Sequence, residues 1–194
     1  MLRPEHERLV IRAVLWLGVL SVTPRTAQLQ QPSVALVRNG TFERRDSANT
    51  NAPAEWSVDG PSAIYRLDSL RQHGGRVSMH VGFAPNSNKE EYSGVIQRAD
   101  VTALRAKRIA FEAYMQRSSP KPTAGIWLVF KTAAGARRGY VNSYKQVTSS
   151  TSAWSRHRLV VTVPADAVEV QFGAAIYDAE GEMWVDDISM TVVK

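Results

Sequence analysis

Residues 168–177 read VEVQFGAAIY, and apolar and polar side chains alternate along this stretch. Successive side chains of a β-strand point to opposite faces, so a period of two predicts a strand with one buried face. The inner face comprises Val168, Val170, Phe172, Ala174 and Ile176. The outer face comprises Glu169, Gln171, Gly173, Ala175 and Tyr177. The stretch therefore predicts one strand of a sheet that is buried on one side only.

The same period of two recurs throughout the chain after residue 34, with turn-forming residues between the periodic stretches. No window shows the 3.6-residue period of a long amphipathic helix. We therefore expect an all-β chain, an antiparallel β-sandwich of about ten to eleven strands over residues 35–194. The predicted strands lie at 33–37, 55–58, 63–67, 76–83, 93–98, 109–117, 125–132, 138–147, 156–163, 168–177 and 183–193.

The N-terminus has the pattern of a secretory signal peptide. Three arginines within the first twelve residues precede the apolar run AVLWLGVLSV at 13–22. A positive start and an apolar core of about ten residues are typical of a cleavable leader, and a bilayer span needs about 20. We expect a signal peptide at 1–27 and a short linker at 28–34, which predicts a secreted or periplasmic protein. Cleavage after Ser21 and an uncleaved N-terminal anchor are the alternatives.

Composition excludes several kinds of site. The chain has no cysteine, which rules out disulfides, thiolate zinc sites and thiol nucleophiles. The net charge is +6, and four arginines and two glutamates in the predicted leader contribute +2 of it. The remaining basic residues are scattered, which predicts a solvated surface and no nucleic-acid partner. We expect no membrane span after cleavage of the leader, and the pattern does not indicate an oligomeric state.

No catalytic motif stands out in the sequence. The four histidines lack the spacing of a zinc motif such as HExxH, and no serine lies in a GxSxG elbow. Adjacent carboxylates such as Asp186 and Asp187 face opposite sides of a strand, so they cannot flank one glycosidic bond. We therefore expect a non-catalytic chain. An active site assembled from residues far apart in the sequence is the alternative.

Several predicted strands carry aromatic rings on their outer faces, next to amide and carboxylate side chains. Sugars present C–H patches that stack on aromatic rings, and their hydroxyls need polar partners. This combination predicts one carbohydrate-binding platform on an outer sheet face. The alternative is that the rings lie under loops or support one another as ordinary cross-strand pairs. The predicted ligand-binding residues are Tyr114, Trp127, Tyr177, Glu112, Gln116, Gln171, Tyr140 and Tyr144.

The two ends of the predicted sandwich carry a familiar pattern. NGTFE at 39–43 is followed by Trp56, and MWVDDISM stands at 183–190. Together with the stretches 104–114 and 154–173, these motifs resemble the galactose-binding-like jelly rolls among carbohydrate-binding modules of the xylan- and glucan-binding type. The resemblance covers about residues 34–194. It implies a non-catalytic secreted module that binds a poly- or oligosaccharide, with a structural or protein-interaction sandwich as the alternative function.

The resemblance also implies a structural calcium ion between the first and last strands. By position, Glu43 and Asp186 would each supply a carboxylate oxygen, and Asn39 and Asp187 would assist. Calcium takes six to eight oxygens and accepts mixed carboxylate and carbonyl ligands. The alternative is that Glu43 and the two aspartates are ordinary charges of turns and edge strands.

Overall fold

The computed structural model describes residues 36–60, 63–84, 92–120, 123–146, 153–177 and 181–194. The predicted leader at 1–27 and linker at 28–34 lie outside these residues. Within the described ranges, no helix is both long enough and apolar enough to cross a membrane. The described part of the chain from residue 36 onward belongs to one compact unit.

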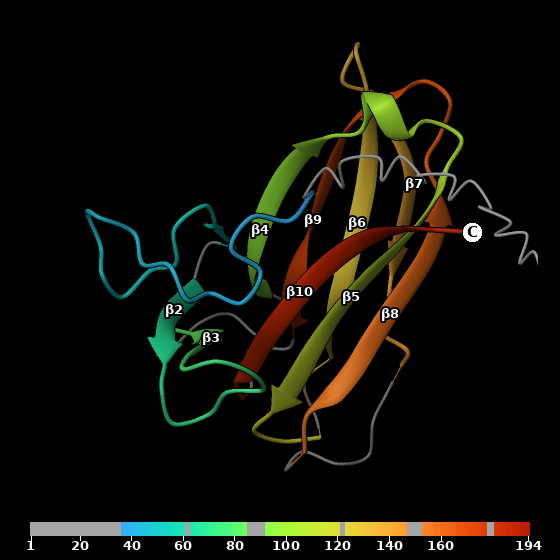
Figure 1. Ribbon diagram of the computed structural model, residues 1–194. Coiled ribbons are helices and arrows are strands. Elements are labelled where there is room, and N and C mark those ends of the chain that lie inside the picture. Colours follow the sequence, from blue (N-terminus) through green and yellow to red (C-terminus); the bar gives the residue numbers. More distant parts are fainter. Residues whose placement is uncertain (1–35, 61–62, 85–91, 121–122, 147–152, 178–180) are drawn as a thin grey trace, which may run out of the picture. The chain divides into compact units, whose positions relative to one another are not determined.

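Over these described ranges, ten strands form two five-stranded sheets, which confirms the predicted all-β antiparallel sandwich (Figure 1). Sheet I has the order β1-β4-β9-β6-β7 and sheet II the order β2-β3-β10-β5-β8, and neighbours pair antiparallel throughout. One 3₁₀ turn, η1 (Thr102–Leu104), joins β4 to β5. The strands are β1 (Ser57–Asp59), β2 (Ala63–Asp68), β3 (Ser78–Phe83), β4 (Tyr92–Asp100), β5 (Arg108–Arg117), β6 (Ala124–Thr132), β7 (Arg137–Asn142), β8 (Ser155–Thr162), β9 (Ala167–Tyr177) and β10 (Met183–Val193).

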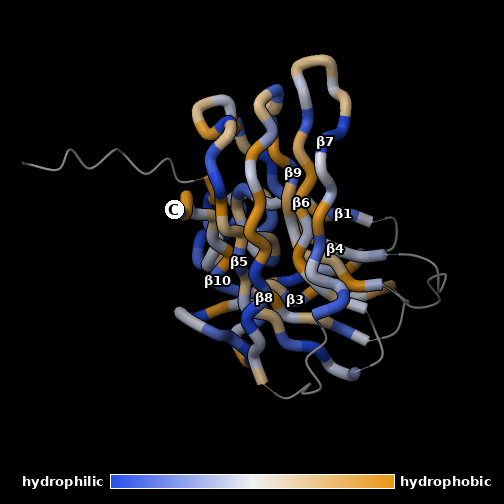
Figure 2. The backbone as a smooth tube through the Cα atoms, turned by 90° about the vertical axis from the view of Figure 1, so that its right-hand side faces the viewer, coloured by the Kyte–Doolittle hydropathy of each residue, from blue (hydrophilic) through white to orange (hydrophobic). Residues whose placement is uncertain are grey.

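The core lies between the two sheets, where the alternating apolar side chains of both meet. Phe111 of β5 and Phe172 of β9 contact edge to face across it, with ring centroids 5.3 Å apart. The apolar stretches of β6 and β9 are visible in Figure 2. The inner phase predicted for β9 is correct from Val170 to Ile176. At its start Ala167 is buried instead of Val168, because the β6–β9 register shifts beside Thr132.

The predicted strand at 33–37 is wrong for its described part. Residues 36–42 form bends and turns, and Asn39 and Phe42 adopt left-handed φ angles of 51° and 57°. The backbone N–H of Arg38 donates to the side chain of Gln97 and not to a neighbouring strand. An apolar stretch becomes a strand only where a partner backbone is available, and here a side chain takes that place.

The start of the described chain nevertheless lies against the last strand, as the resemblance implies. Ile188 N donates to the Gly40 carbonyl at 2.9 Å. A Cβ on Gly40 would overlap the Ile188 carbonyl oxygen, so only glycine permits this approach. The contact falls where β10 bulges between Asp186 and Ser189, and Asp187 there has φ 48°. The NGTFE motif thus packs on the bulge of β10.

Candidate functional site

The outer face of sheet I is a grid of side chains set by strand register. Arg98 of β4 pairs with Gln171 of β9, Gln171 pairs with Val129 of β6, and Val129 pairs with Tyr140 of β7. Residues paired in this way share a face, so these four side chains form one row across the sheet. The row runs from a guanidinium at β4 to an aromatic ring at β7.

The next rows place small residues in the middle of the face. Ile96 pairs with Gly173, which pairs with Trp127, and Ala175 follows two residues along β9. A Cβ on Gly173 would overlap the Val95 carbonyl oxygen, so β4 and β9 need glycine at this close approach. The missing side chains leave a groove of about 310 Å³ lined by Asp59, Tyr92, Ile96, Arg98, Trp127, Val129, Arg137, Tyr140, Gln171, Ala175 and Tyr177.

Four aromatic rings wall this groove. Tyr92 and Tyr177 are cross-strand partners with centroids 5.8 Å apart, and Trp127 and Tyr140 lie 6.3 Å apart. Tyr140 is 52% exposed and Trp127 only 8%, so Tyr140 forms a rim and Trp127 a floor. Tyr144 packs edge to face on Tyr177 at 5.1 Å, behind the groove wall.

The tyrosine hydroxyls form a hydrogen-bonded chain. Tyr140 Oη donates to Tyr144 Oη at 3.3 Å, and the hydroxyls of Tyr144 and Tyr177 lie 3.1 Å apart. Tyr92 Oη donates to Asp59 Oδ1 at 3.2 Å. Burial raises the pKa of Tyr144, and it also raises the pKa of Tyr177 and of Tyr92. These hydroxyls therefore stay protonated, and they are neutral donors and acceptors of the kind a sugar hydroxyl requires.

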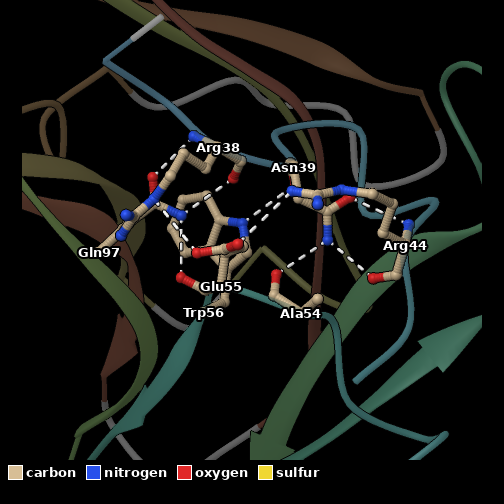
Figure 3. A network of polar contacts seen from close by, with 7 residues as sticks. All are labelled: Arg38, Asn39, Arg44, Ala54, Glu55, Trp56 and Gln97. Atoms are coloured by element: carbon tan, nitrogen blue, oxygen red, sulfur yellow. Dashed lines mark hydrogen bonds and ion pairs between the residues drawn. The ribbon is translucent and has the colours of Figure 1, made fainter. Parts of the chain in front are cut away.

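A second hollow of about 420 Å³ adjoins the first and shares Asp59, Ile96 and Arg98 with it. Figure 3 shows the network on which it rests. Gln97 Oε1 accepts from Arg38 N at 2.8 Å, and Gln97 Nε2 donates to the carbonyls of Arg38 and Glu55. Arg38 Nε also lies 3.3 Å from Glu55 Oε2. The two hollows together form a groove that extends across β4 to the β1 edge.

The predicted single platform is wrong, because the structure divides its residues between the two sheets. Trp127, Tyr177, Gln171, Tyr140 and Tyr144 belong to the groove region of sheet I. The other three predicted residues, Glu112, Tyr114 and Gln116, lie on β5 in sheet II. Alternation shows which side chains face outward from a strand, but it does not show which sheet the strand joins.

The three β5 residues already have partners. Arg156 NH2 and Arg158 Nε both donate to the Glu112 carboxylate, at 2.7 and 2.5 Å. The His73 ring stacks on Tyr114, with centroids 3.5 Å apart and an interplanar angle of 12°. Gln116 also takes part in an interaction within the protein. This part of sheet II therefore follows the alternative in which outer side chains support one another.

Sequence reasoning missed Asp59, Tyr92, Ile96, Arg98 and Arg137 as groove residues. Tyr92 is an aromatic residue directly before the predicted strand at 93–98, and that strand begins one residue too late to include it. Ile96 and Arg98 were visible as outer positions of that strand, although nothing in the sequence paired them with Gly173 and Gln171. Only the β4–β9 register brings them to the groove.

The carboxylates predicted to hold calcium accept hydrogen bonds from N–H groups instead. Glu43 Oε1 accepts from the backbone N–H groups of Arg76 and Val77, and its Oε2 accepts from Arg76 Nε. The Arg76 N–H holds the pKa of Glu43 below its usual range. Asp186, 0% exposed, accepts from the N–H groups of His73 and Gly74 and from its own neighbour in β10. Burial raises the pKa of Asp186 to about 6.

The other two predicted ligands are also engaged. Asn39 Nδ2 donates to the carbonyls of Arg44 and Ala54, and its Oδ1 accepts from Arg44 N. Asp187 Oδ2 lies 2.6 Å from His73 Nδ1. No group of three or more His, Cys, Asp or Glu side chains in the described ranges is placed to hold a metal. N–H groups occupy the carboxylate oxygens of Glu43 and Asp186 in this arrangement, and calcium binding by the four side chains stays a prediction.

A buried serine–histidine pair links the edges of the two sheets. Ser143 Oγ, just after β7, lies 2.8 Å from His157 Nδ1 of β8, and it accepts from Ile126 N at 3.0 Å. Burial lowers the pKa of His157 to about 4, with a smaller contribution from the positive charge of Arg117. Both residues are closed to solvent, so the pair is a structural contact and not a nucleophile.

No protein-family model and no curated protein matches the chain, whereas solved structures do. A xylan-binding domain of carbohydrate-binding module family 22 superposes with a TM-score of 0.58 at 16% identity, covering 83% of this chain and 97% of that one. A family 16 carbohydrate-binding module gives 0.57 at 16% identity, covering 80% and 99%. The enzymatically active domain of bacteriophage CBA120 tailspike protein 4 gives 0.61 at 10% identity, covering 82% and 22%.

These similarities confirm the resemblance drawn from the NGTFE and WVDDI motifs. The chain has the β-sandwich fold of carbohydrate-binding modules of families 22 and 16. It covers 97% and 99% of the family 22 and family 16 modules but only 22% of the tailspike domain. At these identities the similarity shows the fold, and function has to be argued from the groove.

Proposed function

We propose that this chain is a secreted, non-catalytic module that binds a poly- or oligosaccharide in the groove of sheet I. The observation that carries the proposal is the set of three tyrosine rings around a floor of Trp127 and small residues. The sandwich fold shared with carbohydrate-binding modules supports it. The signal-peptide pattern at 1–27 supports secretion.

Each part of the groove has a role in such binding. Tyr92, Tyr140 and Tyr177 offer ring faces to the C–H patches of sugars, and Trp127 adds apolar surface to the floor. The Gln171 amide and the tyrosine hydroxyls supply donors and acceptors beside the rings. A shallow polar groove exchanges water for ligand with little net gain, so the affinity of one groove is weak.

The carboxylates of the groove support a non-catalytic role. Asp59 accepts a hydrogen bond from Tyr92, and Glu55 pairs with Arg38 and Arg44. Glycoside hydrolysis needs two carboxyl groups facing one bond, one of them free to give up a proton. Each of these two acidic groups is already held by a partner. We infer that the groove retains a glycan without cleaving it.

Affinity electrophoresis against xylan, β-glucan and galactan tests the proposal. The purified chain should be retarded by at least one of these polysaccharides. Tyr177→Ala should abolish the retardation, because it removes a ring from the groove wall and the end of the hydroxyl chain. Tyr114→Ala is the matched control: it removes a tyrosine from the outer face of sheet II and should leave retardation unchanged. A chain that ignores every glycan in folded form would contradict the proposal.

A further inference from the structure

Positive charge gathers at one end of the groove. Arg98 of β4 and Arg137 at the start of β7 both line it. Lys131 pairs with Arg137 across β6 and β7, and its ammonium lies 4.0 Å from Glu169. Asp59, one of the acidic residues of the groove, pairs with Gly94 through its backbone. Gly94 is four residues along β4 from Arg98, which is about 13 Å in an extended strand. The positive and negative side chains therefore lie toward opposite ends of the groove.

Arg98 and Arg137 differ from two other arginines near the groove, which form ion pairs with acidic side chains. Arg38 pairs with Glu55, and Arg138 pairs with Asp166. The side chains of Arg98 and Arg137 have neither an ion pair nor a hydrogen bond in the described part of the chain. Glu169, the acidic neighbour in the next row, is occupied by Lys131 and by Gln171 Nε2 at 3.0 Å. Two guanidinium groups thus line the groove with their donors unused.

Arg98 also lies where the two hollows meet. It lines both of them, together with Asp59 and Ile96. A chain of sugars long enough to fill the extended groove would pass this side chain, whereas a single sugar among the rings need not reach it. Guanidinium presents a planar fork of donors that matches a carboxylate with two parallel hydrogen bonds.

Resting on the proposed function, we infer that the groove selects an acidic glycan, whose uronic acid carboxylates bind Arg98 and Arg137. The rings at the Tyr92–Tyr177 end bind neighbouring sugars by stacking, and the two arginines at the other end bind the negatively charged carboxylates. The hydroxyl chain of the tyrosines is neutral, so it adds no repulsion to an anionic ligand. Removing the charge from the glycan should cost affinity without abolishing binding.

Isothermal titration of the purified chain with glucuronoxylan, and with the same polysaccharide after reduction of its carboxyl groups, tests this inference. Charge-assisted hydrogen bonds from arginine predict a dissociation constant about tenfold lower for the native polysaccharide. Arg98→Gln should remove that difference between the two polysaccharides. Arg108→Gln is the control, because it removes the same charge from β5 in sheet II.

Each other outcome overturns the inference. Equal binding of the native and reduced polysaccharides would refute the acidic preference while leaving the proposed function intact. Binding of neither would refute both. A preference that Arg108→Gln also removes would reduce the effect to net charge. Dextran sulfate bound as tightly as glucuronoxylan, with the same dependence on Arg98, would show that the groove reads any anion and not a uronic acid.

Discussion

The two outer faces of the sandwich have similar side chains but differ in their exposure. Both carry aromatic and polar side chains on alternating positions, but the groove of sheet I is open and much of sheet II is covered. The segment between β2 and β3 makes the difference. Arg71 lies 4.0 Å above the Trp184 ring, Trp184 Nε1 donates to Asp68 at 2.9 Å, and His73 stacks on Tyr114. On sheet I the tyrosines contact mainly one another.

The comparison shows that an outward ring is available to a ligand only where no other segment of the chain packs on it. A buried polar group needs a partner, and the chain supplies one wherever a loop can reach. The loop at 69–77 reaches sheet II and supplies N–H groups to Asp186 and Glu43. Within the described residues, the side chains of Arg98 and Arg137 that line the groove of sheet I have no ion pair or hydrogen bond. The face that the proposed function uses is therefore the one that the loop at 69–77 does not reach.

The largest effect is expected at the covered face. Asp186→Ala leaves the N–H groups of His73 and Gly74 without their acceptor and releases the loop from β10. Loss of a fully buried, hydrogen-bonded carboxylate predicts a fall of about 3 kcal/mol in the free energy of unfolding. Urea titration measures it. A variant as stable as the wild type would show that the loop does not depend on Asp186.

A pH-dependent effect of similar size should test the link between the two sheets. The folded-state pKa of His157, about 4, is below its ordinary 6.5, so the unfolded chain binds its proton first as pH falls. The contribution of neutral His157 to the free energy of unfolding is complete above pH 6.5. It falls by about 3 kcal/mol in total as the pH is lowered toward 4.

The raised pKa of Asp186 acts in the opposite direction over an overlapping range. The measurement is therefore the difference in stability between wild type and His157→Gln against pH. That difference should shrink as the solution is acidified from 6.5 to 4. A difference independent of pH would show that the pKa of His157 is unshifted.

At the open face, Tyr177→Phe removes one hydroxyl and keeps the ring. The Tyr144–Tyr177 hydrogen bond orients the hydroxyl chain, so its loss predicts affinity for the retained glycan about fivefold weaker, or about 1 kcal/mol. Isothermal titration measures it, and Tyr114→Phe serves as the control on sheet II. Unchanged affinity would assign recognition to the rings alone.

The smallest effect is expected from calcium. The N–H donors around Glu43 and Asp186 predict the same melting midpoint in calcium and in chelator. A rise of several degrees with calcium, absent from Asp186→Ala, would instead support the ligand set implied by the resemblance. That result would mean that the loop at 69–77 rearranges to bring carbonyl oxygens to the ion.

Much of the fold was predictable because alternation is a local property. β5, β9 and β10 lie within one residue of their predicted limits, since β5 and β9 have continuous apolar inner faces and β10 has an apolar series on each side of its bulge. The stretch at 33–37 has the same local pattern, but its described residues 36 and 37 form no strand, and Gln97 binds the backbone of Arg38, which follows them. A polar side chain from a distant strand leaves no periodic signal in the segment that it holds.

The sequence by itself determined that the chain is a sandwich and which side chains leave each strand outward. Tertiary structure alone decided that Tyr114 and Trp127 lie on different sheets, because strand order depends on pairings between residues far apart. It also decided which outer face is open, because coverage depends on where the loop at 69–77 finds acceptors. The groove exists because the registers of β9 with β4 and with β6 place Gly173 and Ala175 between Arg98 and the tyrosines. Register is a property of pairs of strands, so no single strand sequence determines it.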